Sequence, residues 1–431
     1  MTTTTAPAAS AAAALADRET LRLCTAGSVD DGKSTFVGRL LHDTKSVLAD
    51  QLASVERTSA DRGFEGLDLS LLVDGLRAER EQGITIDVAY RYFATDKRTF
   101  ILADTPGHVQ YTRNTVTGMS TSQVVVLLVD ARNGVVEQTI RHLTVAKLLG
   151  VRTVILAVNK IDLVGYSEET FNEIKAAFDA KAAELGIEDP HVVPISALKG
   201  DNVAERSDAT PWYDGPTVLE LLETIPVNHG RADDLDFRFN IQYVLREHAT
   251  DYRAYAGRVN AGSVSVGDEI LAPHGRTTTV AGIDSTDGPV DTAHAGDSVA
   301  LRLADEIDLT RGDLLASQSR PEDVREFAAT VVGLTEKELR AGQAVKLRIG
   351  TAFVRARVAS VDRVLDIDGA VGDNTSPEAV ALNEIAHVTI QTADELPVEP
   401  YAARGAVGNF LLVDQSSGNT LAAGLVGKRL R

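Results

Sequence analysis

The sequence predicts an α/β domain, with a doubly wound and mostly parallel sheet, followed by two antiparallel β-barrel domains. Between residues 21 and 228, short apolar runs alternate with helical stretches, which is typical of a parallel sheet covered by helices on both faces. From residue 236 to the end, glycine turns separate short β-branched runs and helical patterns nearly vanish, as expected for antiparallel barrels. Residues 226–228, Pro-Val-Asn, mark the change.

The first part alternates regularly enough for individual elements to be predicted. Strand-like apolar runs lie at residues 21–26, 100–103, 124–129, 154–158 and 192–195. Helical stretches lie at residues 137–149 and 167–185, and in the former the apolar residues recur at mostly helical spacing. Because such sheets bind ligands at the carboxyl ends of their strands, we expect the functional residues there.

A chain of 431 residues is too long for one ordinary domain. We expect the α/β domain at residues 20–228 and the barrels at residues 229–317 and 318–431, with a linker at Ser317-Gln318-Ser319-Arg320-Pro321. Residues 1–19 are expected to form a flexible tail. The first 16 carry no charged side chain and lack the basic and strongly apolar regions of a signal peptide.

Composition and charge argue against several classes of protein. The net charge of −19 disfavours a large basic field for nucleic acid, and the chain has no apolar run of about 18 residues that could span a membrane. The single cysteine, Cys24, cannot form an intramolecular disulfide, and its apolar neighbours predict a buried core residue. We therefore expect a cytoplasmic protein with neither nucleic acid nor a membrane as partner.

A phosphate-binding loop is predicted directly after the first strand. The sequence Gly27-Ser28-Val29-Asp30-Asp31-Gly32-Lys33-Ser34 fits the pattern G-x-x-x-x-G-K-[ST], and a helical stretch beginning at Thr35 follows it. Glycines let backbone N–H groups curl around phosphates, and the helix N-terminus adds partial positive charge. In this motif we expect Lys33 to neutralise the β- and γ-phosphates and Ser34 to ligate Mg²⁺.

Three further strand ends predict that the nucleotide is GTP. At Asp104-Thr105-Pro106-Gly107, Asp104 can hold Mg²⁺ through water and the Gly107 N–H can sense the γ-phosphate. At Asn159-Lys160-Ile161-Asp162, Asp162 can accept hydrogen bonds from guanine N1–H and N2–H₂, a pattern that adenine lacks. At Ser196-Ala197-Leu198, a backbone N–H can meet guanine O6. Alone, Asn159 and Asp162 could belong to an Asx-capped turn, but four elements at successive strand ends favour the nucleotide site.

The order and spacing of these motifs, with two β-domains after them, resemble the translation-factor (elongation factor Tu-like) GTPases. The resemblance implies that Thr85, in Gly83-Ile84-Thr85-Ile86, ligates Mg²⁺ with its hydroxyl and the γ-phosphate with its N–H, as part of the first switch. It also implies that His108 orients the attacking water. The alternative interpretations are an ordinary strand around Thr85 and a structural histidine. His42, His142, His191 and His248 lack such a context and are expected to be surface or packing residues.

Several stretches resemble one branch of that superfamily, the large GTPase subunits of bacterial sulfate adenylyltransferase (ATP sulfurylase). They are residues 27–35, 71–76, 78–93 and 110–114, and elongation factors usually carry histidine where this chain has Ser28 and Asp31. The resemblance implies a heterodimer, or an assembly of heterodimers, with a small catalytic subunit. The small subunit makes adenylylsulfate and pyrophosphate from ATP and sulfate, and the large subunit hydrolyses GTP to drive that synthesis. Some relatives carry a fused adenylylsulfate kinase with its own phosphate loop. This sequence has no second such loop, so that activity is not expected.

Two alternatives stay open. A translation factor that delivers aminoacyl-tRNA shares the fold and the GTP chemistry, although Ser28, Asp31 and residues 71–93 count against it. A binding module could hold GTP only as a structural ligand, although Lys33, Thr85 and His108 together argue for turnover.

Overall fold

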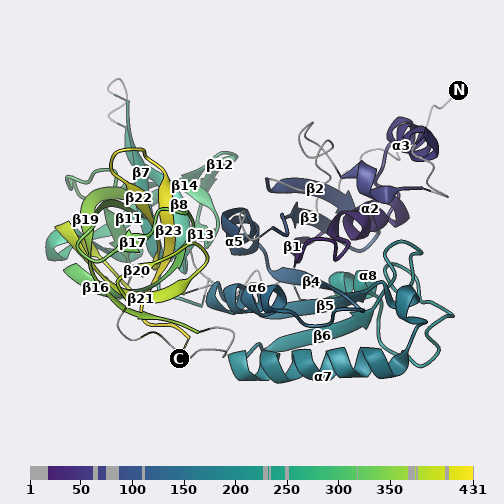
Figure 1. The fold of residues 1–431 in the computed structure, drawn as a ribbon. Coiled ribbons are helices and arrows are strands. Elements are labelled where there is room, and N and C mark those ends of the chain that lie inside the picture. Colours follow the sequence, from purple (N-terminus) through teal and green to yellow (C-terminus); the bar gives the residue numbers. More distant parts are fainter. Residues whose placement is uncertain are drawn as a thin grey trace, which may run out of the picture. The chain divides into compact units, whose positions relative to one another are not determined.

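The computed structural model describes residues 18–61, 67–73, 87–108, 112–226, 232, 234–247, 252–317, 319–366, 374, 377–402 and 407–430. The chain forms two compact units, Met1–Val227 and Asn228–Arg431 (Figure 1). The expected tail lies outside the described residues, apart from residues 18 and 19. The domain boundaries at residues 228 and 318 stay predictions.

A six-stranded sheet in the order β2-β3-β1-β4-β5-β6 forms the centre of the first unit. Its strands are β1 (Thr20–Gly27), β2 (Ala89–Ala94), β3 (Thr99–Asp104), β4 (Val124–Asp130), β5 (Thr153–Asn159) and β6 (Asp189–Pro194). β2 runs antiparallel to β3 at one edge, and the other neighbours are parallel. β1 has β3 on one side and β4 on the other, so the strand order changes direction there. This is the point at which doubly wound sheets bind their ligands.

Helices cover both faces of this sheet. They are α2 (Lys33–Asp43), α5 (Thr112–Ser120), α6 (Glu137–Leu148), α7 (Glu168–Leu185) and α8 (Val218–Thr224). A further helix, α3 (Ala49–Asp61), contacts the 3₁₀ turn at Leu69–Leu72, and a second 3₁₀ turn lies at Ile161–Val164. On one face, α2 and α8 share an apolar core with alternate residues of β1, β3 and β4. On the other face, Gly118 of α5 packs so closely that a Cβ there would lie 3.3 Å from Cys24 Sγ. β4 and β5 are buried along their whole length because both faces are covered. Cys24 is buried as predicted.

The second unit contains two antiparallel barrels. The first consists of β7 (Arg238–Glu247), β8 (Tyr252–Ala261), β10 (Glu269–Ala272), β11 (Arg276–Ser285), β12 (Gly288–Val290), β14 (Ser298–Leu303) and β15 (Leu314–Ala316), with β9 (Ser263–Ser265) and β13 (Thr292–His294) paired beside it. The second consists of β16 (Asp323–Gly333), β18 (Ala344–Ile349), β19 (Ala352–Val364), β21 (Ile385–Pro397), β22 (Asn409–Asp414) and β23 (Thr420–Val426), with β17 (Leu339–Arg340) and β20 (Ala379–Val380) as a separate pair. In the first barrel, pairing between β10 and β11 closes the sheet, and the second is closed in the order β16-β21-β19-β18-β22-β23. The predicted fold class is confirmed.

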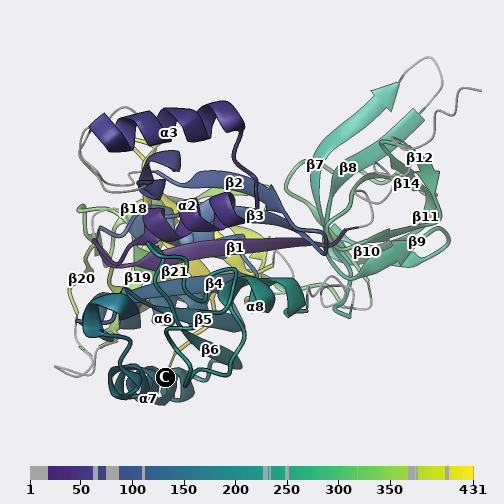
Figure 2. The ribbon, with the colours of Figure 1, turned by 90° about the vertical axis from the view of Figure 1, so that its right-hand side faces the viewer.

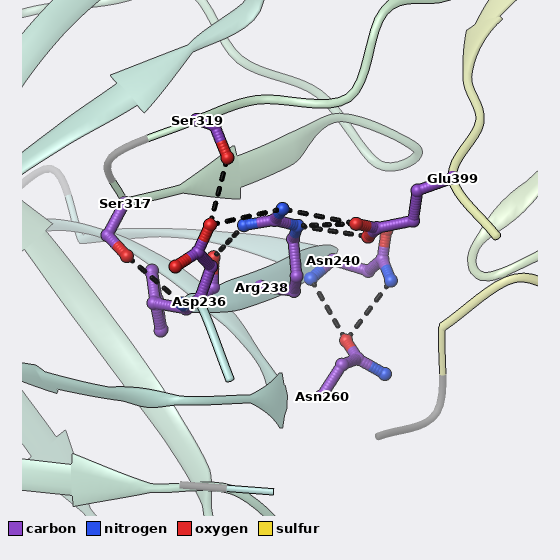
Figure 3. Close-up of polar contacts among 8 residues, drawn as sticks. Asp236, Arg238, Asn240, Asn260, Ser317, Ser319 and Glu399 are labelled. Carbon is purple, nitrogen blue, oxygen red and sulfur yellow. Dashed lines mark hydrogen bonds and ion pairs between the residues drawn. The ribbon is translucent and has the colours of Figure 1, made fainter. Parts of the chain in front are cut away.

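An ion pair joins the two barrels (Figure 3). The guanidinium of Arg238, on β7, donates from Nε to Glu399 Oε1 at 2.9 Å and from Nη2 to Glu399 Oε2 at 3.1 Å. Arg238 Nη1 also donates to the carbonyl of Phe237 at 3.0 Å, and its side chain is only 7% exposed. Such a bidentate, charge-assisted contact fixes orientation as well as distance. It therefore holds the barrels in one relative orientation within the unit.

Candidate functional site

The predicted phosphate loop lies between the end of β1 and the start of α2, which contact each other (Figure 1). Its curvature depends on residues with positive φ, Asp30 at 65° and Gly32 at 89°. A Cβ on Gly32 would collide with the side-chain amide of Asn159. A Cβ on Gly107 would collide with Lys33 Nζ and approach the Gly27 carbonyl oxygen to 2.8 Å. Both positions thus require glycine because the backbone and neighbouring side chains approach one another there.

Two charged side chains are buried within this loop. Lys33 Nζ donates to the carbonyl oxygens of Gly27 at 3.0 Å and Ser28 at 2.6 Å, and burial lowers its pKa. The Asp31 carboxylate accepts from the Ser28 N–H at 2.6 Å, and burial raises its pKa. Lys33 is the first residue of α2, and Ser34 and Thr35 follow it in the first helical turn. The ammonium and the helix N-terminus thus place positive charge at the loop, as a phosphate requires.

Asp104 at the end of β3 is held by the neighbouring strand. Thr25 lies opposite Asp104 in the parallel register, and its hydroxyl donates to Asp104 Oδ1 at 2.9 Å. The hydroxyl of Thr105 donates to the carbonyl oxygen of Thr25 at 2.6 Å. The structure therefore brings Asp104, Gly107 and the phosphate loop together, as the sequence predicted.

Asn159 joins the phosphate loop to the third predicted motif. Its side-chain Nδ2 donates to the Asp31 carbonyl oxygen at 2.7 Å, and its Oδ1 accepts from the Ala197 N–H at 3.0 Å. Lys160, held at φ 61°, donates from Nζ to the Asp30 carbonyl oxygen at 2.5 Å. The strand ends after β1, β5 and β6 thus form one connected site.

The remaining base-recognition residues lie beside Asn159. The Asp162 carboxylate is nearly buried, and Lys199 Nζ lies 3.6 Å from its Oδ2. Of the three residues Ser196, Ala197 and Leu198, the first two donate their backbone N–H groups to Asp201 and Asn159 respectively. The Leu198 N–H makes no hydrogen bond in the part of the chain that the structure describes. Of the three backbone N–H groups in this motif, that of Leu198 is therefore the one that can donate to a ligand.

Two positioning residues escaped the sequence-based prediction. Asp130, at the end of β4, accepts from Arg132 and forms an ion pair with Lys160 Nζ at 3.0 Å, and these contacts hold its pKa well below the usual range. It stands opposite Asn159 in the register, so the strand-end rule that found Asn159 could also have found it. Arg39 of α2 donates from Nε to the Ala197 carbonyl at 3.0 Å and from Nη2 to the Leu198 carbonyl at 2.5 Å. No sequence signal points to Arg39.

Two further catalytic residues, Thr85 and His108, are predicted outside these loops. Thr85 lies outside the described residues. His108 directly follows Gly107 and is partly exposed, so its role stays a prediction. Of the other histidines, His42 contacts Asp43, His191 contacts Asp189, and His142 is buried in α6.

The fold and the connected strand ends define a GTP-binding protein of the translation-factor type. Residues 18–228 match the family of the elongation factor Tu GTP binding domain, and residues 326–427 match the GTP-eEF1A C-terminal domain-like family. The Saccharomyces cerevisiae Ski7 GTPase-like domain shares the fold, with a TM-score of 0.53 at 16% identity over 99% of this chain and 100% of that one.

Within that class, the chain belongs to the family of sulfate adenylyltransferase subunit 1. It is 48% identical to that subunit of Citrobacter koseri over 94% of this chain and 86% of the relative. It is 46% identical to that of Bacteroides fragilis over 96% and 87%. It is also 50% identical to the bifunctional enzyme CysN/CysC of Mycobacterium tuberculosis over 94% of this chain and 67% of the relative. Among the described residues, no helix is long and apolar enough to cross a membrane.

Proposed function

We propose that this chain hydrolyses GTP at the connected strand ends and that hydrolysis drives a partner's synthesis of adenylylsulfate. The partner is a small catalytic subunit that joins sulfate to the adenylyl group of ATP and releases pyrophosphate. The two chains form a cytoplasmic heterodimer or an assembly of heterodimers. Family membership supports this function, since relatives at 46–48% identity are named sulfate adenylyltransferase subunit 1.

The observation that carries the choice of nucleotide is the Asn159 bridge. Its amide ties the phosphate loop to the Ala197 backbone, so the phosphate and base sites are held in one geometry. Asp162 then accepts from guanine N1–H and N2–H₂, and the Leu198 N–H donates to O6. Adenine offers an acceptor at N1 and an amino group at C6, so both contacts fail.

The residues around the phosphate loop suit a magnesium ion. Mg²⁺ is usually bound by one or two protein oxygens together with substrate phosphates and water. Asp104 is buried beside the loop, with its Oδ1 oriented by Thr25, and Ser34 lies in the first turn of α2. The described residues include no group of three or more His, Cys, Asp or Glu that could hold a metal, which fits a site completed by phosphates. Ser34, Asp104 and Thr85 would hold the ion, which supplies positive charge to the phosphate oxygens.

The chain's own residues have distinct roles in this proposal. Lys33 neutralises charge on the β- and γ-phosphates, and His108 orients the attacking water. Thr85 and Gly107 detect the γ-phosphate through their N–H groups. The nucleotide contacts are assigned to Gly27, Ser28, Val29, Asp30, Asp31, Gly32, Lys33, Ser34, Thr35, Asp104, Gly107, Asn159, Lys160, Asp162, Ser196, Ala197 and Leu198.

Coupling requires that the partner's reaction intermediates bind the GTP and GDP states unequally. The segments around Thr85 and Gly107 change their contacts when the γ-phosphate leaves, so they are the elements that the partner must sense. Replacing Thr85 by Ala should leave GDP affinity nearly unchanged and uncouple hydrolysis from adenylylsulfate synthesis. A fully coupled Thr85→Ala enzyme would contradict this assignment.

GTP hydrolysis by the chain alone, and with the small subunit, ATP and sulfate, tests the proposed function. We expect strong stimulation only when all three are present. A hydrolysis rate that does not change with the partner or sulfate, but increases when ribosomes are added, would favour a translation factor. The absence of turnover under every condition would favour a structural GTP ligand.

A further inference from the structure

The outer face of the second barrel carries a cluster of cations around an exposed aromatic ring. The cluster spans the neighbouring strands β19, β18 and β22. Arg348 lies directly opposite Phe353 on one side and Leu411 on the other, and Lys346 lies opposite Arg355. Residues paired in this way project from the same face of a sheet. We define the basic–apolar face as Lys346, Arg348, Phe353, Arg355, Arg357 and Leu411.

The apolar part of this face is open to solvent. Phe353 is 53% exposed and Leu411 is 38% exposed, whereas the alternating residues of the same strands fill the barrel core. Lys346 Nζ lies 5.3 Å from the centre of the Phe353 ring, a cation–π distance that orients the ring without covering it. A closed barrel is a rigid support, so this surface is already in the shape in which it would bind.

The charges on this face are arranged at a cost to the barrel. Like charges directly opposite each other in a sheet are destabilising, and Lys346 faces Arg355. Within the described ranges, Lys346, Arg348 and Arg355 form no ion pair, and Arg357 donates to the neutral Gln391 at 2.7 Å. The whole chain carries 62 acidic and 43 basic residues, so carboxylates were abundant for pairing. Unpaired cations clustered on an acidic protein indicate a partner that supplies the opposite charge.

Two possible occupants fit this face poorly. A symmetric contact between two copies would place the same cations against each other, and a head-to-tail contact would tend to extend into open filaments. Nucleic-acid binding usually neutralises about six to ten phosphates, more than the four cations here, and the net charge of −19 opposes it. An acidic protein surface with an apolar pocket matches both the arginines and the phenylalanine, which are enriched at protein interfaces.

We propose that the basic–apolar face docks the small partner subunit, through an acidic surface on that subunit with a pocket for Phe353. This inference rests on the proposed function, because the partner is the catalytic subunit named there. Phe353 and Leu411 supply the apolar centre of the contact, and the cations surround it. The charges steer association and set the orientation, and the ring adds apolar contact at the centre.

Calorimetric titration of the full chain with the purified small subunit tests the proposal. We expect the double variant Arg348→Glu, Arg355→Glu to weaken the dissociation constant at least about 30-fold and Phe353→Ser to weaken it about tenfold. Raising the salt concentration from about 50 to about 300 mM should weaken wild-type binding and affect the double variant much less.

The control is Arg325→Glu, which makes the same kind of substitution once, with half the charge change of the double variant, on β16 of the same barrel. Arg325 is exposed and lies 3.4 Å from Glu395, so we expect binding within about twofold of wild type. GDP affinity should be unchanged in every variant, since the nucleotide site lies in the other unit. Thermal unfolding is measured to show that each variant is folded at the temperature of the titration.

The outcomes separate the two proposals. If wild type binds the small subunit and the double variant binds it equally well, the basic–apolar face is not the docking site. If wild type does not bind the small subunit, both the proposed function and the assignment of the small subunit to this face are refuted. Self-association in sedimentation velocity that the double variant abolishes would instead identify a second copy. RNA binding that the double variant abolishes would identify nucleic acid.

Discussion

Arg39 should determine guanine-nucleotide affinity although it belongs to neither a nucleotide motif nor a switch. Its guanidinium holds the carbonyls of Ala197 and Leu198, in the turn whose Ala197 N–H donates to Asn159. Arg39→Met keeps most of the apolar stem and removes both hydrogen bonds. The loop must then be ordered when the nucleotide binds, so part of the binding energy is lost.

The size of the effect follows from these two contacts. A hydrogen bond from a charged donor contributes about 1.5–3 kcal/mol. Arg39 is 16% exposed, so solvent screens it little, but Leu198 is half exposed and water can replace the second contact. We therefore expect a loss of about 2 kcal/mol, which corresponds to a dissociation constant for GDP about 30-fold weaker.

The assay is an equilibrium titration with a fluorescent GDP analogue, together with thermal unfolding. Arg39→Lys is the matched control, because it keeps the charge but cannot donate in a rigid fork, and its affinity should lie between wild type and Arg39→Met. Hydrolysis at saturating GTP should be close to wild type, since neither contact involves the phosphate loop. Arg39→Met that binds GDP within about twofold of wild type at equal stability would refute the reasoning.

Three further predictions concern the buried side chains of Arg238, His142 and Asp130. Arg238→Met should destabilise the second unit by about 3 kcal/mol in urea unfolding, because it leaves Glu399 without its partner, and Glu399→Met added to it should restore part of the loss. Burial, with Lys33 and Arg141 nearby, lowers the pKa of His142 to about 3 from 6.5, so unfolding takes up a proton below pH 6.5. The free energy of unfolding should therefore keep this contribution above pH 6.5 and fall as the pH drops toward 3, by about 2 kcal/mol between pH 6.5 and 5. Over the same interval, the His142→Gln variant should lose about 2 kcal/mol less than wild type. An equal loss in both proteins would show that His142 is not responsible. Asp130→Asn should weaken GDP binding about fivefold by loosening Lys160, and an unchanged titration would show that Lys160 holds its position without Asp130.

The strand-end motifs could be predicted because their chemistry restricts the residue types. Asp104 and Asn159 end their strands, Lys33 follows the loop after β1, and parallel strands bring those ends together. Asp130 follows the same rule but belongs to no recognised sequence motif. Its role becomes visible only through the register that sets it opposite Asn159.

Contacts between distant segments could not be predicted in the same way. Arg39 and Ala197 are 158 positions apart, and Arg238 and Glu399 are 161 apart. An arginine on an amphipathic helix or a β-strand resembles any solvated cation until packing places a carbonyl or carboxylate beside it. The basic–apolar face likewise depends on the register of three strands, since Arg348, Phe353 and Leu411 are not neighbours in sequence.

The central claim is that GTP hydrolysis supplies free energy to adenylylsulfate synthesis, and the amount of adenylylsulfate at equilibrium tests it most directly. Forming the phosphosulfate anhydride is strongly unfavourable, so the small subunit with ATP and sulfate alone should stop at a low yield. With this chain and GTP present, the account predicts a yield well above that limit, with GTP consumed in proportion and no excess when a non-hydrolysable GTP analogue replaces GTP. A faster approach to the same final yield would contradict the account, because it would make the chain an activator of the partner and not a source of free energy.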